Sequence, residues 1–369
     1  MKNIRFEPKE LQVVGEMPSF MPEMPGTPLY DFPVTRRQNY IATMKKEPIW
    51  QVTNIEAGLF TPQVYPDNVA RGFVFEANML APELFGGKDM FGIEWVYVPV
   101  AGGSMVKPGS PLLNDANEWY SKVVWPDIDS WDWEGSAKSN EEYLKNNDMF
   151  MLHWIMNGYF ERLISFMDFE GAAVAMIDED QKEAVKELFE KLTDLYIKII
   201  DKFIKYYHAE GFTVHDDWGS QKDPFFSPAT CKEMLVAPMR RLTDYIHSRG
   251  CIADFHCCGH VERQVPNMVD AGWDSWSGML MNDTKEVYEK YGDKIIIGVN
   301  PDPFGPDASE EEQRAAAKDY VGKYCQPGKP SIFNLYSADM LTPAFREELY
   351  KLSRIKFQEL AEASSVGTV

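Results

Sequence analysis

From residue 148 onward, the sequence alternates between two hydrophobic patterns. Short apolar runs at 148–156, 212–215, 251–256, 273–276, 294–300 and 331–336 have the length of buried strands. Between them lie segments with apolar residues at helical spacing, expected as helices at 159–169, 178–210, 228–249, 261–270, 285–291, 309–324 and 342–363. In 178–210, for example, residues 185, 188, 189, 192, 195 and 196 are apolar, and Gly211 follows. This alternation predicts a parallel sheet covered by helices.

The first part of the chain is less regular. Residues 1–34 are rich in Pro and Met and are expected to form an extended arm packed on the body or on a second subunit. A helix is predicted at 35–46 with Thr35 as its N-cap, and a first strand at 48–53. The stretch 56–140 is expected to be a long insertion over the barrel mouth, with one strand candidate at 91–98. About eight strand candidates favour one α/β domain, residues 1–369, folded as a (β/α)8 TIM barrel.

Composition narrows the class of protein. The 369 residues are 44 % hydrophobic, enough for a sizeable core. The net charge of −20 argues against binding to nucleic acid or to an anionic membrane, which require basic patches. Five cysteines, two of them adjacent, do not suggest a disulfide framework, and the N-terminus has no apolar leader pattern. No run reaches the length of a membrane span, so we expect a cytoplasmic protein.

Two of the predicted strands end in potentially catalytic side chains. His215, Asp216 and Asp217 follow one strand, and His256 and Cys258 end the other. Because strand side chains alternate, Asp254, His256 and Cys258 share a face, while Cys257 points away. His-x-Cys offers two metal ligands, but a site needs a third from elsewhere. The alternative interpretation is a core histidine among small buried thiols.

Other strand ends and one aromatic segment supply further candidates. His215, Asp217, His256 and Tyr336 are the candidate catalytic residues, Asp217 as a general acid or base or as a partner that orients His215. The alternative for these acidic residues is a helix cap or a salt bridge at the barrel rim. Met and aromatic residues between 148 and 167 fit a core, but the same lining suits a flat aromatic or macrocyclic ligand. The candidate substrate-binding residues are Asp216, Gln221, Trp154 and Asn300.

Several common motifs are missing. No G-x-G-x-x-G follows a predicted strand, and no Walker A sequence is present, so nucleotide binding has no support. No G-x-S-x-G elbow occurs, and no early His-x-His indicates a metal-dependent barrel hydrolase.

The sequence resembles the uroporphyrinogen decarboxylase superfamily, and within it the corrinoid-dependent methyltransferases of the O-demethylase methyltransferase I-like branch. The resemblance runs from Arg36 through the last helix and rests most specifically on His215-Asp-Asp-Trp-Gly-Ser-Gln221, Phe226-Ser-Pro228, His256-Cys-Cys-Gly259 and Ala271-Gly-Trp-Asp274. It implies a (β/α)8 barrel. The decarboxylase signature Arg-Gln-Ala-Gly-Arg is missing, and Arg36-Arg-Gln-Asn-Tyr40 stands there instead, which argues against porphyrinogen decarboxylation.

The resemblance also implies a cofactor and a partner. Thiol-methylating members hold zinc with His-x-Cys and a late Cys, and here His256 and Cys258 match the first two ligands. The late Cys has no clear match, since the last strand offers Tyr336 and Ser337 and Cys325 precedes it. The resemblance therefore suggests a different half-reaction, in which a methyl donor is demethylated and its methyl group passes to the corrinoid (cobalamin) cobalt of a separate protein. A homodimer is expected from the family alone.

Two other functions remain open from the sequence. One is decarboxylation of a tetrapyrrole or another acidic substrate, which requires an arginine cluster at the mouth. The other is corrinoid or porphyrin binding without catalysis, which the four ionisable groups His215, Asp217, His256 and Cys258 disfavour.

Overall fold

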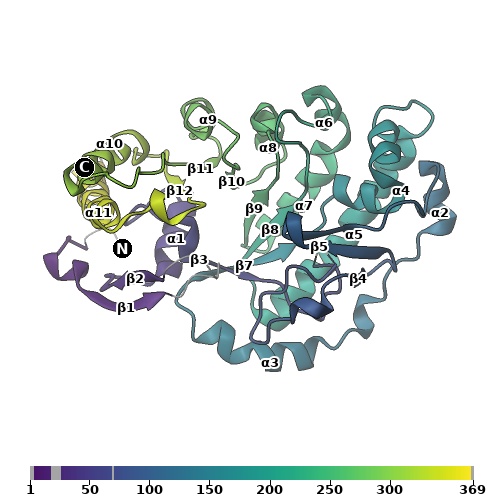
Figure 1. Cartoon of the computed structure of the whole chain (residues 1–369), viewed down its shortest axis with the longest axis horizontal. Helices are drawn as coiled ribbons and strands as arrows, with labels where there is room; N and C mark the ends of the chain where they lie inside the picture. Colours follow the sequence, from purple (N-terminus) through teal and green to yellow (C-terminus); the bar gives the residue numbers. More distant parts are fainter. Residues whose placement is uncertain (1–3, 18–25, 69, 367–369) are drawn as a thin grey trace. The chain divides into compact units, whose positions relative to one another are not determined.

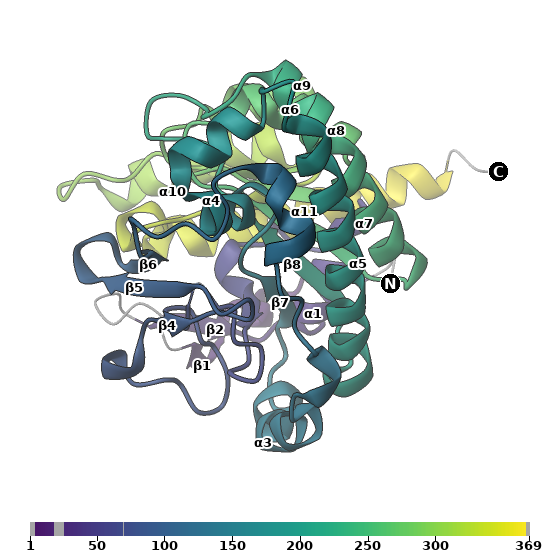
Figure 2. The ribbon, with the colours of Figure 1, turned by 90° about the vertical axis from the view of Figure 1, so that its right-hand side faces the viewer.

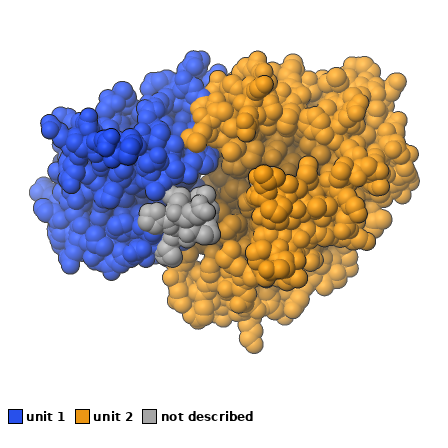
Figure 3. Space-filling view, viewed as in Figure 1, with its two compact units in different colours: residues 1–58, 148–150, 283–369 blue, residues 59–147, 151–282 orange. Residues whose placement is uncertain are grey.

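The chain divides into two compact units. The structure, a computed structural model, describes residues 4–17, 26–68 and 70–366. Unit 1 comprises the described residues of Met1–Gly58, Asp148–Phe150 and Asp283–Val369, and unit 2 those of Leu59–Asn147 and Met151–Asn282 (Figure 3). Each unit is described by itself below.

Unit 1 contains a two-stranded ribbon, two parallel strands and four helices among its described residues. They are β1 (Val13–Met17), β2 (Thr27–Tyr30), α1 (Arg36–Met44), α9 (Thr284–Tyr291), β11 (Ile296–Val299), α10 (Glu310–Tyr324), β12 (Ser331–Phe333) and α11 (Pro343–Val366). β1 and β2 are antiparallel, and β11 and β12 are parallel, with Ile297 opposite Ser331. Strand β3 (Ala57–Phe60) lies at the boundary of the two units.

Unit 2 combines a parallel sheet, its helices and a small antiparallel sheet. Its elements are β4 (Gly87–Lys88), β5 (Glu94–Val98), β6 (Gly103–Val106), α2 (Trp119–Lys122), α3 (Trp133–Lys145), β7 (Phe150–Ile155), α4 (Phe160–Ala175), α5 (Lys182–Tyr207), β8 (Gly211–His215), α6 (Pro228–Met234), α7 (Val236–Ser248), β9 (Ile252–His256), α8 (Val265–Asp270) and β10 (Ser275–Ser277). Strands β7, β8, β9 and β10 are parallel neighbours in that order. Figures 1 and 2 show the long helices α5 and α7 beside this sheet.

The element order confirms the predicted fold class. Parallel strands alternate with helices from β7 to α11, which is the arrangement of a mixed α/β fold of the TIM-barrel type. β8 is buried along its whole length, as expected for a parallel strand covered on both faces. α5 ends at Tyr207, four residues before Gly211, because His208 adopts a left-handed conformation and its N–H bonds to the Phe203 carbonyl.

Two predicted elements are wrong. Residues 48–53 form no regular strand, and only Thr53 makes a bridge, to Phe333. Their backbone is bonded to side chains instead, since Asn39 accepts from the N–H groups of Ile49 and Trp50. The predicted helix 228–249 is divided at Leu235 into α6 and α7. Pro238 stands in the first turn of α7, where its missing N–H is tolerated, whereas in one continuous helix its ring would clash with the carbonyl of Met234.

The segment before β7 is more ordered than its composition predicted. β4, β5 and β6 form an antiparallel sheet, which contains the strand candidate 91–98 as β5. In the N-terminal arm, the buried Glu10 carboxylate lies 2.8 Å from Nε of Arg354 and accepts a hydrogen bond from Tyr350, both on α11. Among the residues that the structure describes, no helix is both long and apolar enough to cross a membrane.

Candidate functional site

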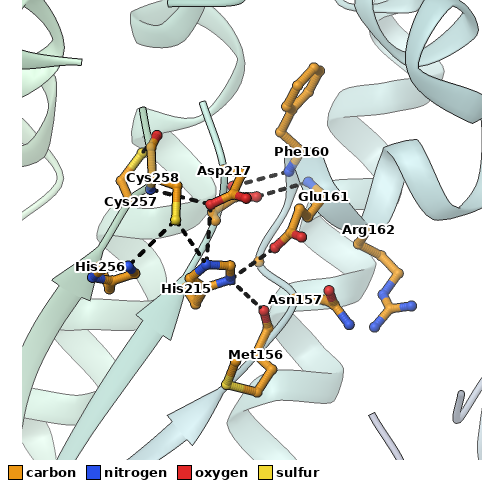
Figure 4. Close-up of polar contacts among 12 residues, drawn as sticks. Met156, Asn157, Phe160, Glu161, Arg162, His215, Asp217, His256, Cys257 and Cys258 are labelled. Carbon is orange, nitrogen blue, oxygen red and sulfur yellow. Dashed lines mark hydrogen bonds and ion pairs between the residues drawn. The ribbon is translucent and has the colours of Figure 1, made fainter. Parts of the chain in front are cut away.

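Two neighbouring strand ends of unit 2 bring two imidazoles together. His215 is the last residue of β8 and His256 the last of β9, and the parallel register places them directly opposite each other. Their rings stack with centroids 5.3 Å apart and an interplanar angle of 14°. Cys258, two residues beyond His256, directs its Sγ to 3.6 Å from Nε2 of His256 and 3.8 Å from Nε2 of His215 (Figure 4).

His215 lies at the centre of the polar contacts (Figure 4). Its Nδ1 donates to the Met156 carbonyl at 2.8 Å and lies 3.0 Å from Oε2 of Glu161. Its Nε2 lies 3.1 Å from Oδ1 of Asp217, which also accepts the backbone N–H of Cys258 at 3.2 Å. Oε2 of Glu161 is buried and accepts no hydrogen bond among the described residues, because the Nδ1 proton is directed at Met156.

The charges of two carboxylates fix the protonation of His215. Burial alone would lower the pKa of His215, but the charges of Asp217 and Glu161 outweigh it and raise that pKa well above 6.5. The pKa of Asp217 is lowered although burial opposes this, because the carboxylate faces the His215 ring. At neutral pH, His215 is therefore an imidazolium and Asp217 a carboxylate.

The other three groups are shifted mainly by burial. Burial raises the pKa of Glu161 to about 7 and that of Cys258 to about 11, although His215 opposes both shifts. Burial and the positive charge of His215 lower the pKa of His256 to about 4. The cluster thus combines one cation, one anion, one half-protonated carboxyl, one neutral imidazole and one thiol near pH 7.

The backbone around the cluster is held by the adjacent acid. Asp216 accepts hydrogen bonds from the N–H groups of Tyr159, Phe160 and Glu161 at 3.0, 3.0 and 2.8 Å, and from the Trp218 indole at 2.9 Å. It therefore caps the N-terminus of α4 from the end of β8. Gly158 is required at this turn, since a Cβ there would lie 2.6 Å from Cβ of Asp216.

The two loops after β8 and β9 touch through glycine. Gly259 has a φ of +95°, and a Cβ on it would lie 2.2 Å from the carbonyl oxygen of Gly219. His260 N donates to the carbonyl of Ser220 at 2.7 Å. These contacts hold Cys258 and Asp217 in the same small region, and they explain the glycine in each of the two sequence motifs.

Residues 162–340 match the family described as uroporphyrinogen decarboxylase (URO-D). The match covers just under half of the 369 residues. No curated protein gives a significant sequence match.

Solved structures support the fold. A methyltransferase from Methanosarcina mazei is similar with a TM-score of 0.55 and 12 % identity, covering 88 % of this chain and 99 % of that chain. A D-psicose 3-epimerase from Clostridium cellulolyticum H10, solved with D-tagatose, matches with a TM-score of 0.32 and 8 % identity over 63 % of this chain and 83 % of that chain. The first likeness shows a shared fold, and the second is too weak to support any argument.

Six of the predicted site residues fall into three groups. His215, Asp217, His256 and Cys258 come together in the cluster. Trp154 on β7 is half-buried and forms its apolar wall, with ring centroids 5.5 Å from His256 and 6.4 Å from His215. Both oxygens of Asp216 are occupied by the α4 cap.

The three remaining predicted residues are each described within their own unit. Gln221 is exposed on the loop after β8 and takes no part in the contacts that join the cluster. Asn300 and Tyr336 belong to unit 1, where the amide of Asn300 accepts from Asn334 at 2.7 Å and the Tyr336 N–H donates to Sδ of Met340. The roles expected of these three residues stay predictions.

The sequence analysis missed Glu161. Glu161 stands at the start of α4, in the segment that was interpreted as helix and core. Its neighbours in the sequence, Phe160 and Arg162, are not acidic, so no cluster of acidic residues marks the position. Its one signal is position, because Glu161 comes shortly after β7 and the Asn157-Gly158 pair, and residues just after a barrel strand face the mouth. Glu161 directly precedes the first residue of the matched family region.

Proposed function

We propose that this chain is a cytoplasmic methyltransferase that demethylates a small methyl donor, an aromatic methyl ether, and passes the methyl group to the Co(I) corrinoid of a partner protein. The observation that carries the proposal is the cluster of His215, His256 and Cys258 at neighbouring strand ends, faced by Asp217 and Glu161. The URO-D family match over residues 162–340 and the fold shared with a methyltransferase support the same proposal. The aromatic wall formed by Trp154 suits an apolar donor.

In this reaction, the methyl–oxygen bond of the donor breaks and a methyl–cobalt bond forms on the acceptor. The electron pair for the new bond comes from Co(I), and the oxygen leaves with the pair of the broken bond. That oxygen must be neutralised by a proton or by a Lewis acid. In the protein as described, His215 holds a proton beside the cluster, and Asp217 keeps it there as a counter-charge. Asp217 is therefore better suited to partner His215 than to donate a proton itself.

The predicted metal pair also fits the site. His256 and Cys258 are nitrogen and sulfur donors that share one direction, a set that suits zinc better than Mg²⁺ or Ca²⁺. A bound zinc supplies Lewis-acid chemistry to an oxygen in the pocket. The chain's own contribution is to hold the two ligands by the strand end of β9 and the backbone contact of Gly259 with Gly219.

Three buried arginines are poor candidates for a site that binds a polycarboxylate. Arg162 is fully buried between Asp67 and Asp89 in unit 2. In unit 1, Arg36 pairs with Asp148, and Arg354 pairs with Glu10. These buried guanidinium groups are already engaged, so they are poor candidates for binding the carboxylates of a tetrapyrrole.

The proposal is tested by visible absorbance. Purified protein is mixed with reduced cobalamin, or with a corrinoid protein, and a panel of methoxyaromatics. We expect conversion of Co(I) to methyl-Co(III) with one donor class, and its loss in the double variant with His256→Ala and Cys258→Ala. Full activity in that variant would overturn the proposal, and so would the absence of conversion with every donor and acceptor. Either result would favour decarboxylation or ligand binding without catalysis.

A further inference from the structure

We infer that His215, His256 and Cys258 together form a three-ligand site for a zinc-type divalent cation, with His215 as the third ligand. This inference deepens the proposed function by completing the metal site, and it departs from the His-x-Cys and late-Cys set of the thiol-methylating relatives. The donor atoms of the three residues all lie within 4.8 Å of one another. They come from the ends of two adjacent strands, which are rigid elements of the fold.

The distances fit a tetrahedral ion. With metal–sulfur bonds of about 2.3 Å and metal–nitrogen bonds of about 2.0–2.1 Å, a tetrahedral ion separates sulfur from nitrogen by about 3.6 Å. The Sγ of Cys258 lies 3.6 Å from Nε2 of His256 and 3.8 Å from Nε2 of His215. Both imidazoles therefore present Nε2, and not Nδ1, to the same sulfur at the spacing that one ion requires.

The ring of His215 is oriented as a metal ligand usually is. Metal-binding histidines commonly donate their other ring N–H to a carbonyl or a carboxylate. Nδ1 of His215 does so to the Met156 carbonyl at 2.8 Å, with Glu161 at 3.0 Å. Binding of the ion by Nε2 displaces the proton that His215 carries in the metal-free chain, and the dication then takes the place of that positive charge beside the Asp217 carboxylate, which lies 3.1 Å from Nε2.

The other cysteines point elsewhere. Cys325 ends α10 before β12, and its Sγ donates to the side chain of Gln51 at 3.2 Å. Cys257 is fully buried with its Sγ 3.5 Å from the carbonyl of Cys258, and Cys231 is buried in α6. Within residues 4–17, 26–68 and 70–366, Cys258 is the cysteine found in such a ligand group.

Cobalt(II) substitution tests this ligand set without any methyl-transfer assay. The full chain is stripped of metal with a chelator and titrated with Co(II), which absorbs visible light strongly in four-coordinate sites. We expect one Co(II) per chain, intense visible bands, and a near-ultraviolet sulfur-to-cobalt band that Cys258→Ser removes. Zn(II) should displace the cobalt and bleach the spectrum.

The decisive variant is His215→Gln, which approximates the length of the side chain. We expect it to weaken Co(II) binding by more than the roughly 10- to 100-fold that outer-shell changes cost. Glu161→Gln should fall within that outer-shell range. Cys325→Ser and Cys257→Ala are the matched controls and should keep both affinity and spectrum. Circular dichroism and thermal unfolding of each variant separate a lost ligand from a lost fold.

Two results would overturn the inference. One is a wild-type chain that binds Co(II) no better than the His256→Ala, Cys258→Ala variant. The other is a His215→Gln variant, shown to be folded, that keeps wild-type affinity and spectrum. The proposed function fails separately: metal binding without methyl transfer would leave the ligand set standing, and methyl transfer by a chain that binds no metal would leave the function standing.

Discussion

The fold shifts the pKa values of single residues by placing charged groups beside them. His247 is a second example after His215. His247 is in the last turn of α7, and its Nε2 lies 2.9 Å from Oδ2 of Asp274. The hydrogen bond to Asp274 raises the pKa of His247, although partial burial opposes the shift. Asp244 adds to the rise and Arg240 opposes it. A cation at the C-terminus of a helix is favoured as well.

This pair predicts a pH-dependent stability. Because the pKa of His247 is higher in the folded state, its contribution is complete below the unfolded pKa of about 6.5 and disappears as the pH rises through the folded pKa. The pair is partly exposed, so we expect at most about 1 kcal/mol. Urea unfolding of the wild type and His247→Gln should give a stability difference that shrinks between pH 6 and pH 9. A difference that grows over that range would contradict the assignment. Asp274 is left intact because it also accepts the backbone N–H of Ala253.

At the scale of elements, the site depends on two loops that approach each other closely. Gly259 combines a positive φ with a contact to the Gly219 backbone, whereas Gly250 has a positive φ of +73° and open space around its Cα. A side chain at either position would strain the backbone, but of the two only Gly259 would also bring a steric overlap.

Alanine substitutions at these two positions should differ. Gly250→Ala should cost about 1 kcal/mol of unfolding free energy, from backbone strain alone. Gly259→Ala adds overlap with a carbonyl that cannot move away, so we expect a further 1–3 kcal/mol, roughly, and a displaced Cys258. Chemical denaturation measures the loss of unfolding free energy in each variant. Co(II) binding reports whether Cys258 is displaced in Gly259→Ala. Equal losses of unfolding free energy in the two variants would contradict this prediction. They would show that the loops after β8 and β9 can move apart at no cost in stability.

At the scale of the whole molecule, unit 2 joins two distant stretches of sequence through one buried arginine. Arg162 on α4 lies 2.7 Å from Oδ2 of Asp89 and pairs with Asp67, and all three side chains are fully buried. Asp67 and Asp89 belong to the segment before β7, so the triad connects that segment to the helix that carries Glu161. It thereby helps to position the cluster that Glu161 contacts.

Removing the arginine should be costly. Arg162→Met leaves two buried carboxylates without a partner, and we expect a loss of about 3–5 kcal/mol in unfolding free energy. The control is Arg249→Met, because the pair of Arg249 with Asp201 is about 40 % exposed on each side and should contribute less than about 1 kcal/mol. Similar losses for both variants in urea titrations would refute a special role for the triad. Adding Asp67→Asn and Asp89→Asn to Arg162→Met should recover part of the loss.

The sequence by itself determined the alternation of strands and helices after residue 148 and the polar residues that end β8 and β9. These features are local: side-chain period and strand length follow from neighbouring residues. It also predicted from strand alternation that His256 and Cys258 face the same side, and Sγ of Cys258 lies 3.6 Å from Nε2 of His256 although β9 ends at His256.

Tertiary structure decided which side chains contact each other at the carboxyl ends of β8 and β9. The contact of Glu161 with His215 joins residues 54 positions apart, and it depends on the parallel register of β7 with β8 and on the cap that Asp216 provides to α4. A contact outside the local pattern also explains why no strand forms at 48–53. The Asn39 side chain accepts hydrogen bonds from the N–H groups of Ile49 and Trp50, which the local pattern had assigned to a β-sheet. Local periodicity predicts which residues face inward, but long-range register determines which of them touch, and the chemistry of this site depends on that contact.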